Sequence, residues 1–102
     1  MTERSLFGRV VHVTGAGHGI GRAIARAVAR AGAHVAVSDI DDHSARDTAA
    51  QVQSAGGVAA AWQLDVSDAA RFADVTAQIH ERLGPADTLV NNAGVMHRGH
   101  FL

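Results

Sequence analysis

The 102-residue sequence predicts an α/β fold built on a doubly wound parallel sheet. Short apolar runs alternate with longer segments of helical period, a glycine-rich turn follows the first run, and polar residues come directly after several runs. Strands that alternate with helices form parallel sheets through right-handed crossovers. We therefore expect the order β-α-β-α-β-α-β with strand order 3-2-1-4, and a ligand crevice where the first and fourth strands part.

The first unit is a strand over residues 9–14 followed by a helix over residues 19–31. Apolar, mostly β-branched residues in the strand are typical of a central parallel strand. In the helix, three arginines at four-residue spacing indicate the solvent face. The residues expected on the buried face are Ile20, Ala23, Ile24, Ala27, Val28 and Ala31. Gly32 suits the position after the helix, and residues 1–8 are expected to be an unpaired lead-in.

The second unit is a strand over residues 34–38 that ends at Asp39. Residues 41–44 supply acidic and capping groups for a second helix, which continues to Ala55. The pair of glycines at 56–57 then stops this helix.

The third unit is a strand over residues 58–64 and a helix over residues 68–83, for which Ser67 is the expected N-cap. Gly84 followed by Pro85 is a common helix stop. A fourth strand is expected over residues 88–91.

Composition excludes several classes of partner. The net charge is −1 and the basic residues are spread along the helices, so we expect neither nucleic acid nor an anionic membrane as a partner. Without cysteine the chain has no disulfide or thiolate chemistry. No segment has the length and apolar character of a membrane span. We expect one domain, or part of one, in a soluble cytoplasmic protein.

The turn that contains Gly15, Gly19 and Gly21 indicates a phosphate-binding site. Glycines permit a tight turn, close approach of a pyrophosphate and close packing of helix on sheet. A pyrophosphate over this turn would meet free N–H groups and the positive end of the helix dipole. A glycine turn alone is a weak signal, because such turns occur wherever a strand reverses tightly into a helix.

Three further features stand in order along the chain: Thr14-Gly15-x-x-x-Gly19-Ile20-Gly21, the acid Asp39 after the second strand, and Asn91-Asn92-Ala93-Gly94 after the fourth. Together they resemble the classical short-chain dehydrogenase/reductase family, from about Leu6 to the last residue. The resemblance implies a partial Rossmann-type fold in which residues 1–102 are the N-terminal half of one NAD(P)-binding domain.

The resemblance also implies a cofactor site. The turn would contact the adenosine ribose and pyrophosphate, Asp65 and Val66 the adenine, and the Asn-Asn-Ala-Gly segment the cofactor side of the sheet. Thr14 would tie the turn to that segment, and Asn91 would help to hold the sheet. The cofactor-binding residues so implied are Gly15, Ala16, Gly17, His18, Gly19, Ile20, Gly21, Asp39, Asp65, Val66, Asn92, Ala93 and Gly94.

Asp39 favours NAD over NADP. A carboxylate at this point can accept hydrogen bonds from both adenosine ribose hydroxyls, each worth about 1.5–3 kcal/mol, whereas the 2′-phosphate of NADP would place negative charge against it. The alternative interpretation is that Asp39 only opens the turn that follows, and Asp65 has a matching alternative as an acidic residue before the third helix.

The chain contains no tyrosine and no lysine. In the family these residues serve the proton transfer that accompanies hydride transfer between nicotinamide and an alcohol or carbonyl substrate. General acid–base catalysis needs such a group within hydrogen-bond reach. We therefore assign no catalytic residue and expect this chain to be inactive alone. A non-catalytic dinucleotide-binding module is the alternative; a Rossmann methyltransferase or sugar-nucleotide epimerase fits the glycine spacing less well.

Other polar and aromatic residues have ordinary structural interpretations. Among seven histidines, only His97-x-x-His100 has spacing that suits a metal, and no third ligand is nearby in sequence, so no metal is expected. His12 is expected to be a buried, hydrogen-bonded side chain, and Trp62 to serve packing. The open edge of the fourth strand and the uncovered face of the third helix predict a homo-oligomer.

Overall fold

The computed structural model describes residues 5–93. Its strands form one parallel sheet in the order β3-β2-β1-β4, which confirms the predicted α/β fold and strand order. The strands are β1 (Val10–Thr14), β2 (His34–Asp39), β3 (Val58–Gln63) and β4 (Thr88–Asn91). The helices are α1 (Gly19–Arg30), α2 (Asp42–Ser54) and α3 (Ala69–Leu83).

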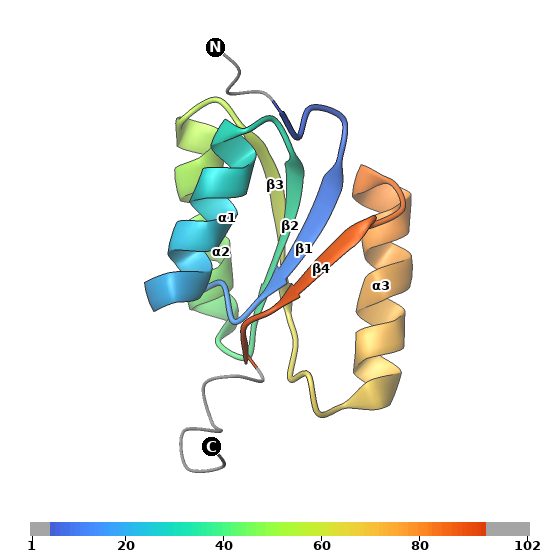
Figure 1. Ribbon diagram of the computed structural model, residues 1–102. Helices are drawn as coiled ribbons and strands as arrows, with labels where there is room; N and C mark the ends of the chain where they lie inside the picture. The colour runs from blue at the N-terminus through green and yellow to red at the C-terminus, as the bar shows by residue number, and fades with distance from the viewer. Residues whose placement is uncertain (1–4, 94–102) are drawn as a thin grey trace, which may run out of the picture.

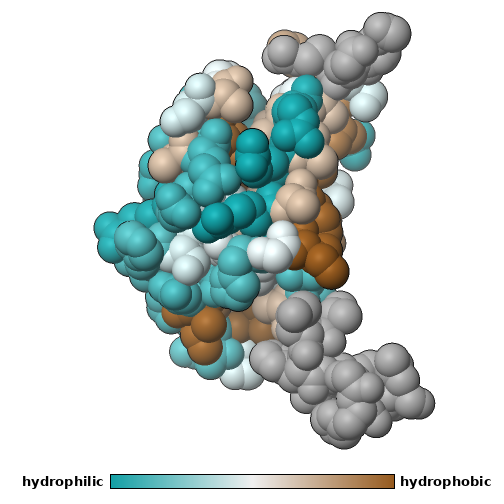
Figure 2. Space-filling view, turned by 90° about the vertical axis from the view of Figure 1, so that its left-hand side faces the viewer, coloured by the Kyte–Doolittle hydropathy of each residue, from teal (hydrophilic) through white to brown (hydrophobic). Residues whose placement is uncertain are grey.

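The described elements form three layers. Helices α1 and α2 cover one face of the sheet and α3 covers the other (Figure 1). The outer surface of the α1 and α2 layer is mainly hydrophilic, as expected for a face in water (Figure 2). Within the sheet, Val13 of β1 lies between Val37 of β2 and Val90 of β4. This register brings the carboxyl ends of β1, β2 and β4 to one edge.

Side-chain alternation along the strands divides the core in two. Val11, Val13, Val35 and Val37 face α1 and α2, and all four are at most 2% exposed. On the opposite face, a second cluster packs against α3 and consists of Val10, Ala36, Ala60, Trp62, Leu64, Val75 and Ile79. Trp62 is 5% exposed within this cluster, so the packing role expected for it is confirmed, and its indole nitrogen donates to Gln78 at 2.9 Å.

The buried face of α1 differs from the predicted one. The buried residues of this helix are Gly21 and Ala25, whereas Ile20 is 66% exposed. Ile24 and Val28 are partly buried against the core, as predicted. The helix is therefore turned so that its smallest residues approach the sheet, which lets α1 pack close to β1. The prediction that Ile20, Ala23 and Ala27 lie on the buried face was wrong, because all three are exposed.

Two end regions also differ from expectation. The N-cap of α3 is Asp68, whose carboxylate accepts from the Arg71 N–H at 3.0 Å. Ser67 was the predicted cap, but both its N–H and its hydroxyl bond to Asp65, at 2.9 and 2.7 Å. The predicted unpaired lead-in was wrong at Leu6, since its N–H donates to the carbonyl of Ala31 at 2.8 Å and its side chain packs on the core.

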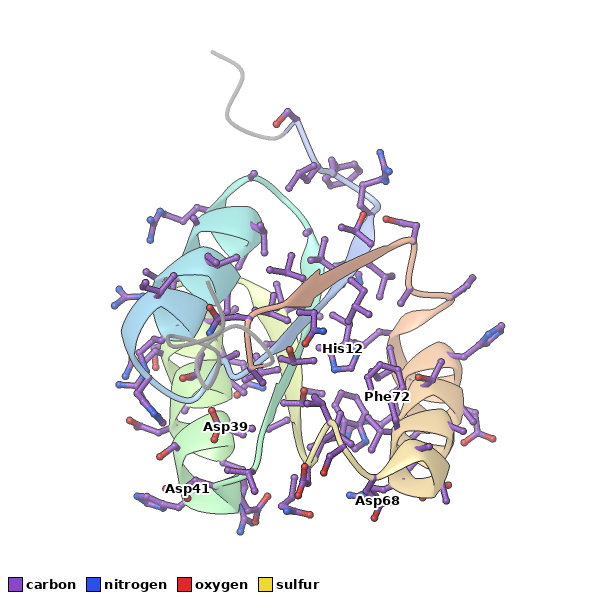
Figure 3. The ribbon with its side chains drawn as sticks, turned by 60° about the horizontal axis from the view of Figure 1, so that its bottom comes forward. His12, Asp39, Asp41, Asp68 and Phe72 are labelled. Carbon is purple, nitrogen blue, oxygen red and sulfur yellow. The ribbon has the colours of Figure 1, made fainter. Side chains whose placement is uncertain are left out.

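His12 lies between the sheet and α3. It is 3% exposed, its Nε2 is 2.9 Å from the hydroxyl oxygen of Ser38, and its ring is 5.9 Å from that of Phe72 (Figure 3). The expectation of a buried, hydrogen-bonded histidine is confirmed. Burial disfavours the charged imidazolium and lowers the pKa of His12 from 6.5 to about 4.

No helix in the described part of the chain is long and apolar enough to cross a membrane.

His12 predicts a pH dependence of stability. The unfolded chain binds a proton at His12 near pH 6.5, whereas the folded chain does so only near pH 4. The contribution of neutral His12 is therefore complete above pH 6.5 and is lost as the pH falls toward 4, by up to about 3 kcal/mol. Urea unfolding of the wild type and of His12→Gln between pH 7 and pH 4 measures this loss of unfolding free energy. The loss should be smaller in the variant; equal losses would contradict the prediction.

Candidate binding site at the carboxyl edge of the sheet

The candidate site is the turn over residues 15–21, which connects β1 to α1 at the carboxyl edge of the sheet. Gly15 and Gly19 have φ angles of 62° and 59°, in the left-handed region that favours glycine. A Cβ on Gly21 would overlap the carbonyl oxygen of Gly15, and a Cβ on Gly15 would lie 2.9 Å from the Cα of Ala93. The turn therefore folds tightly on itself and against the segment after β4.

Thr14 joins this turn to β4. Its hydroxyl oxygen lies 3.1 Å from Oδ1 of Asn91 and 3.3 Å from the carbonyl oxygen of Val90, either of which it can donate to. The same oxygen accepts from the N–H of Ala93 at 3.2 Å. Beside it, the side-chain amide of Asn92 donates to the carbonyl oxygen of Gly15 at 3.2 Å. The predicted tie between Thr14 and the Asn-Asn-Ala segment is confirmed.

Asp39 holds the turn from the side of β2. It is only 4% exposed, and its Oδ2 accepts from the N–H of Gly17 at 2.8 Å. Its Oδ1 accepts from the N–H of Asp41 at 3.0 Å, so Asp39 also opens the turn that follows it (Figure 3). A carboxylate has about four lone-pair positions. Two of these bonds are made here, which leaves acceptor capacity for hydroxyl groups of a ligand.

Arg22 holds Gly17 from the other side and was missed as a site residue. Its Nη2 donates to the carbonyl oxygen of Gly17 at 2.5 Å and pairs with Asp47 at 3.0 Å, and its Nε donates to Thr48 at 2.8 Å. The sequence placed Arg22 on a solvent face because it stands in line with two other arginines. Its partners on α2 are 25 and 26 residues away, and spacing within one helix carries no information about them.

The N-terminus of α1 differs from those of the other helices. Asp41 caps α2 and Asp68 caps α3, each through its side chain. His18, the N-cap of α1, makes no side-chain capping bond, and the first turn of α1 contains no acidic residue. A Cβ built on Gly19 meets nothing within 4 Å. The positive end of α1 is thus left without a capping carboxylate and has open space beside it, which suits an anionic ligand.

Asp65 and Val66 follow β3, two strands away from β1 in the sheet. Oδ1 of Asp65 accepts from the N–H and from the hydroxyl of Ser67. This carboxylate therefore shapes the turn before α3, as expected from the interpretation of Asp65 as an acidic residue that precedes the third helix. Val66 is partly buried against the core on the α3 side. Both residues belong to the carboxyl edge, at the end of β3.

Some predicted residues lie outside the described part of the chain. These are Gly94 of the Asn-Asn-Ala-Gly segment and the histidine pair at 97 and 100. Within residues 5–93, no group of three or more His, Cys, Asp or Glu residues is arranged to hold a metal ion.

The candidate site combines two kinds of polar group. It offers backbone N–H groups and a helix dipole for an anion, and beside them a carboxylate with free acceptor capacity for hydroxyls. A sugar joined to a phosphate carries both kinds of group. The residues present therefore fit the adenosine and pyrophosphate part of a dinucleotide.

Comparison with known proteins agrees with this geometry. Residues 9–102 match the family model for short chain dehydrogenase. "Probable oxidoreductase EphD" of Mycobacterium tuberculosis is 46% identical over 97% of this chain, and 2,3-dihydro-2,3-dihydroxybenzoate dehydrogenase of Bacillus subtilis is 37% identical over 97% of it. The chain spans only 17% and 38% of the length of these two relatives.

Solved structures give the same picture. A hydroxysteroid dehydrogenase from Escherichia coli superimposes with a TM-score of 0.84 at 37% identity, covering 88% of this chain and 38% of the other. A 7 alpha-hydroxysteroid dehydrogenase complexed with NADH and 7-oxo glycochenodeoxycholic acid has the same TM-score at 38% identity, covering 88% of this chain and 35% of the other. The family match covers nearly the whole chain and agrees with the strand order and the glycine turn, so this chain belongs to the short-chain dehydrogenase family.

Proposed function

We propose that this chain is the NAD-binding half of an oxidoreductase that moves a hydride between nicotinamide and an alcohol or carbonyl substrate. The observation that carries this proposal is the pairing of an uncapped α1 N-terminus with Asp39 beside the same turn. Family membership supports the reaction class, because the relatives are named as oxidoreductases and dehydrogenases. The nicotinamide ring supplies the hydride chemistry when the cofactor is bound.

The chain's own residues bind and orient. The N–H groups at the start of α1 would receive the pyrophosphate, with Gly19 leaving room for its approach. Asp39 would accept from the ribose hydroxyls while it keeps its bonds to the backbone. Asp65 and Val66 would lie toward the adenine, and Asn92, Ala93 and Gly94 toward the nicotinamide half.

Asp39 makes NAD the preferred cofactor in this proposal. The ribose 2′-phosphate of NADP would bring negative charge to a nearly buried carboxylate whose two oxygens already accept backbone bonds. Such like charges repel strongly where solvent screening is weak. Arg22 does not offset this repulsion, because it pairs with Asp47 and bonds to Gly17 and Thr48.

A second candidate function is a dinucleotide-binding module without catalysis. The absence of tyrosine and lysine from the 102 residues favours it for this chain in isolation. Both proposals predict that this chain binds NAD. They differ in whether the protein as expressed in its native host also catalyses hydride transfer.

Turnover tests this difference. We expect the 102-residue chain to bind NAD, seen as a titratable change in Trp62 fluorescence or by calorimetry, and to show no NADH formation with simple alcohols. The protein as its native host expresses it should show such formation if the oxidoreductase proposal is correct. Binding without turnover in both forms would support the module, and absence of NAD binding in both would contradict the two proposals together.

Gly19→Ala tests where the cofactor lies. We expect a loss of NAD affinity of about tenfold or more, because the added methyl enters the open space beside the start of α1. Gly8→Ala is the matched control, since Gly8 also has a left-handed φ, of 84°, and open space but is remote from the turn. Both variants should lose about 1 kcal/mol of stability from backbone strain, and only Gly19→Ala should lose NAD affinity.

Asp39→Asn tests the cofactor preference. Removing the charge weakens the bonds from the ribose hydroxyls and relieves repulsion of a 2′-phosphate, so the ratio of NAD to NADP affinity should fall about 10- to 100-fold. Asp42→Asn is the control, because Asp42 is a nearby acid that pairs with Arg46 on the surface of α2. Calorimetric titration of both variants with both cofactors gives the ratio. An unchanged ratio in Asp39→Asn would contradict the assignment.

A further inference from the structure

Helices α1 and α2 are joined by a series of cross-helix side-chain pairs. Arg22 of α1 forms an ion pair with Asp47 of α2 at 3.0 Å. One turn further along both helices, Arg26 donates to the side-chain oxygen of Gln51 at 3.3 Å. Gln51 in turn donates to Asp47 at 3.4 Å, so these four side chains form one connected network.

The next turn breaks this series. Arg30 follows Arg26 by four residues on α1, and Ala55 follows Gln51 by four residues at the C-cap of α2. The partners offered by α2 thus change from a carboxylate to an amide and then to a methyl group. Among the interactions of residues 5–93, Arg30 makes no hydrogen bond or ion pair.

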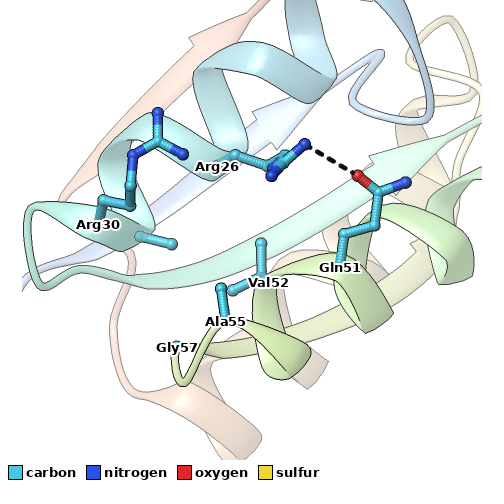
Figure 4. Close-up of a pocket in the computed structure, with 7 residues that line it drawn as sticks. Arg26, Arg30, Gln51, Val52, Ala55 and Gly57 are labelled. Atoms are coloured by element: carbon cyan, nitrogen blue, oxygen red, sulfur yellow. Dashed lines mark hydrogen bonds between the residues drawn. The ribbon is translucent and has the colours of Figure 1, made fainter.

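A small pocket lies where the third partner is missing (Figure 4). Small and alkyl residues, two arginines and a glutamine surround it. Its volume is about 30 Å³. The residues that line it are Arg26, Ala29, Arg30, Gln51, Val52, Ala55 and Gly57.

The charge around the pocket is positive and uncompensated. No carboxylate lines it, while Arg26 is bonded only to a neutral amide and Arg30 has no partner in the described part of the chain. A guanidinium group presents planar N–H donors that match the two oxygens of a carboxylate. The missing partner in the series is therefore a carboxylate.

The size of the pocket decides between kinds of ligand. Sites for small molecules have volumes of about 300–1,000 Å³, whereas this pocket has room only for a group the size of one carboxylate with its methylene. The surrounding surface of α1 and α2 is mainly hydrophilic and would suit the polar flanks of a peptide (Figure 2). The pocket also lies toward the C-terminal ends of both helices, away from the glycine turn at the start of α1.

We propose that this pocket receives one carboxylate side chain from an acidic segment of a partner protein. The carboxylate accepts from Arg30 and Arg26 and completes the third cross-helix pair, and its methylene packs on Val52 and Ala55. Because both arginines are exposed, binding is weak and decreases with added salt. Arg30 lies outside the network that joins Arg26 to Arg22, so an Arg30 variant tests this pocket independently of the proposed NAD site.

The direct test is an NMR titration of the full 102-residue chain with an acetylated, amidated tetraglutamate peptide. We expect the Arg30 and Arg26 side-chain N–H resonances to shift with tetraglutamate and to stay unchanged with tetraglutamine. Arg30→Gln should abolish the shift at Arg26 while it leaves NAD affinity unchanged. A shift of the same size in Arg30→Gln, or no shift with tetraglutamate, would overturn the proposal.

A second test places the carboxylate in the same chain. Ala55→Glu puts an acid at the vacant position, and Ala55→Gln is the matched neutral control. We expect Ala55→Glu to abolish tetraglutamate binding. Because a carboxylate at the C-cap of α2 is disfavoured by the helix dipole, we compare the melting temperatures of Ala55→Glu and Ala55→Gln in two backgrounds, and we expect the comparison to favour Glu more in wild type than in Arg30→Gln. Tetraglutamate binding that survives Ala55→Glu would overturn the proposal even if both variants fold less well.

Two other occupants are distinguished by the same variants. If free glutarate shifts the Arg30 resonance at the same concentrations as the peptide, the ligand of the pocket is a small carboxylate and not a protein segment. If sedimentation velocity shows self-association of the wild type that is lost in Arg30→Gln, the occupant of the pocket is a second copy of this chain. Either result would overturn the assignment to an acidic segment of another protein.

Discussion

The structure depends on the close passage of the backbone over residues 15–21. No Cβ fits on Gly21, because the carbonyl oxygen of Gly15 occupies that space, and none fits on Gly15, because Ala93 lies against it. This contact brings the start of α1 to the carboxyl edge of the sheet and fixes the segment after β4 beside it. A side chain at either glycine would separate the elements that form the site.

Gly17 shows how the protein's own side chains hold the turn in shape. Its N–H donates to Asp39 and its carbonyl oxygen accepts from Arg22, so both polar groups of this residue are fixed by charged side chains from β2 and α1. Arg22 is itself anchored on α2 through Thr48 and Asp47. A turn fixed in this way loses little conformational freedom on binding, which leaves more of the interaction energy for affinity.

The sequence predicted the strand order, and most element boundaries to within one residue, because apolar runs, helical period and glycine stops are local signals. Side-chain contacts between different helices, strands and turns could not be predicted from the sequence. Ile20 has the period of a core residue, but period alone does not tell a helix face that meets the sheet from an apolar face that stays exposed. Ser67 and Asp68 are both good caps, and the choice depended on where Asp65 directs its carboxylate. Arg22 was misplaced because its partners belong to another helix.

The position of β4 at the edge beside β1 also bears on how the chain folds. The other strand pairs join segments that are close in sequence, whereas Thr14 and Asn91 are separated by 77 residues. The entropy of closing so long a loop must be overcome before these bonds stabilise anything. We therefore expect β1 to β3 with α1 and α2 to assemble first and β4 to join last. The turn over residues 15–21 is held in part by Asn92 and Ala93, so it would reach its final shape only at the end of folding.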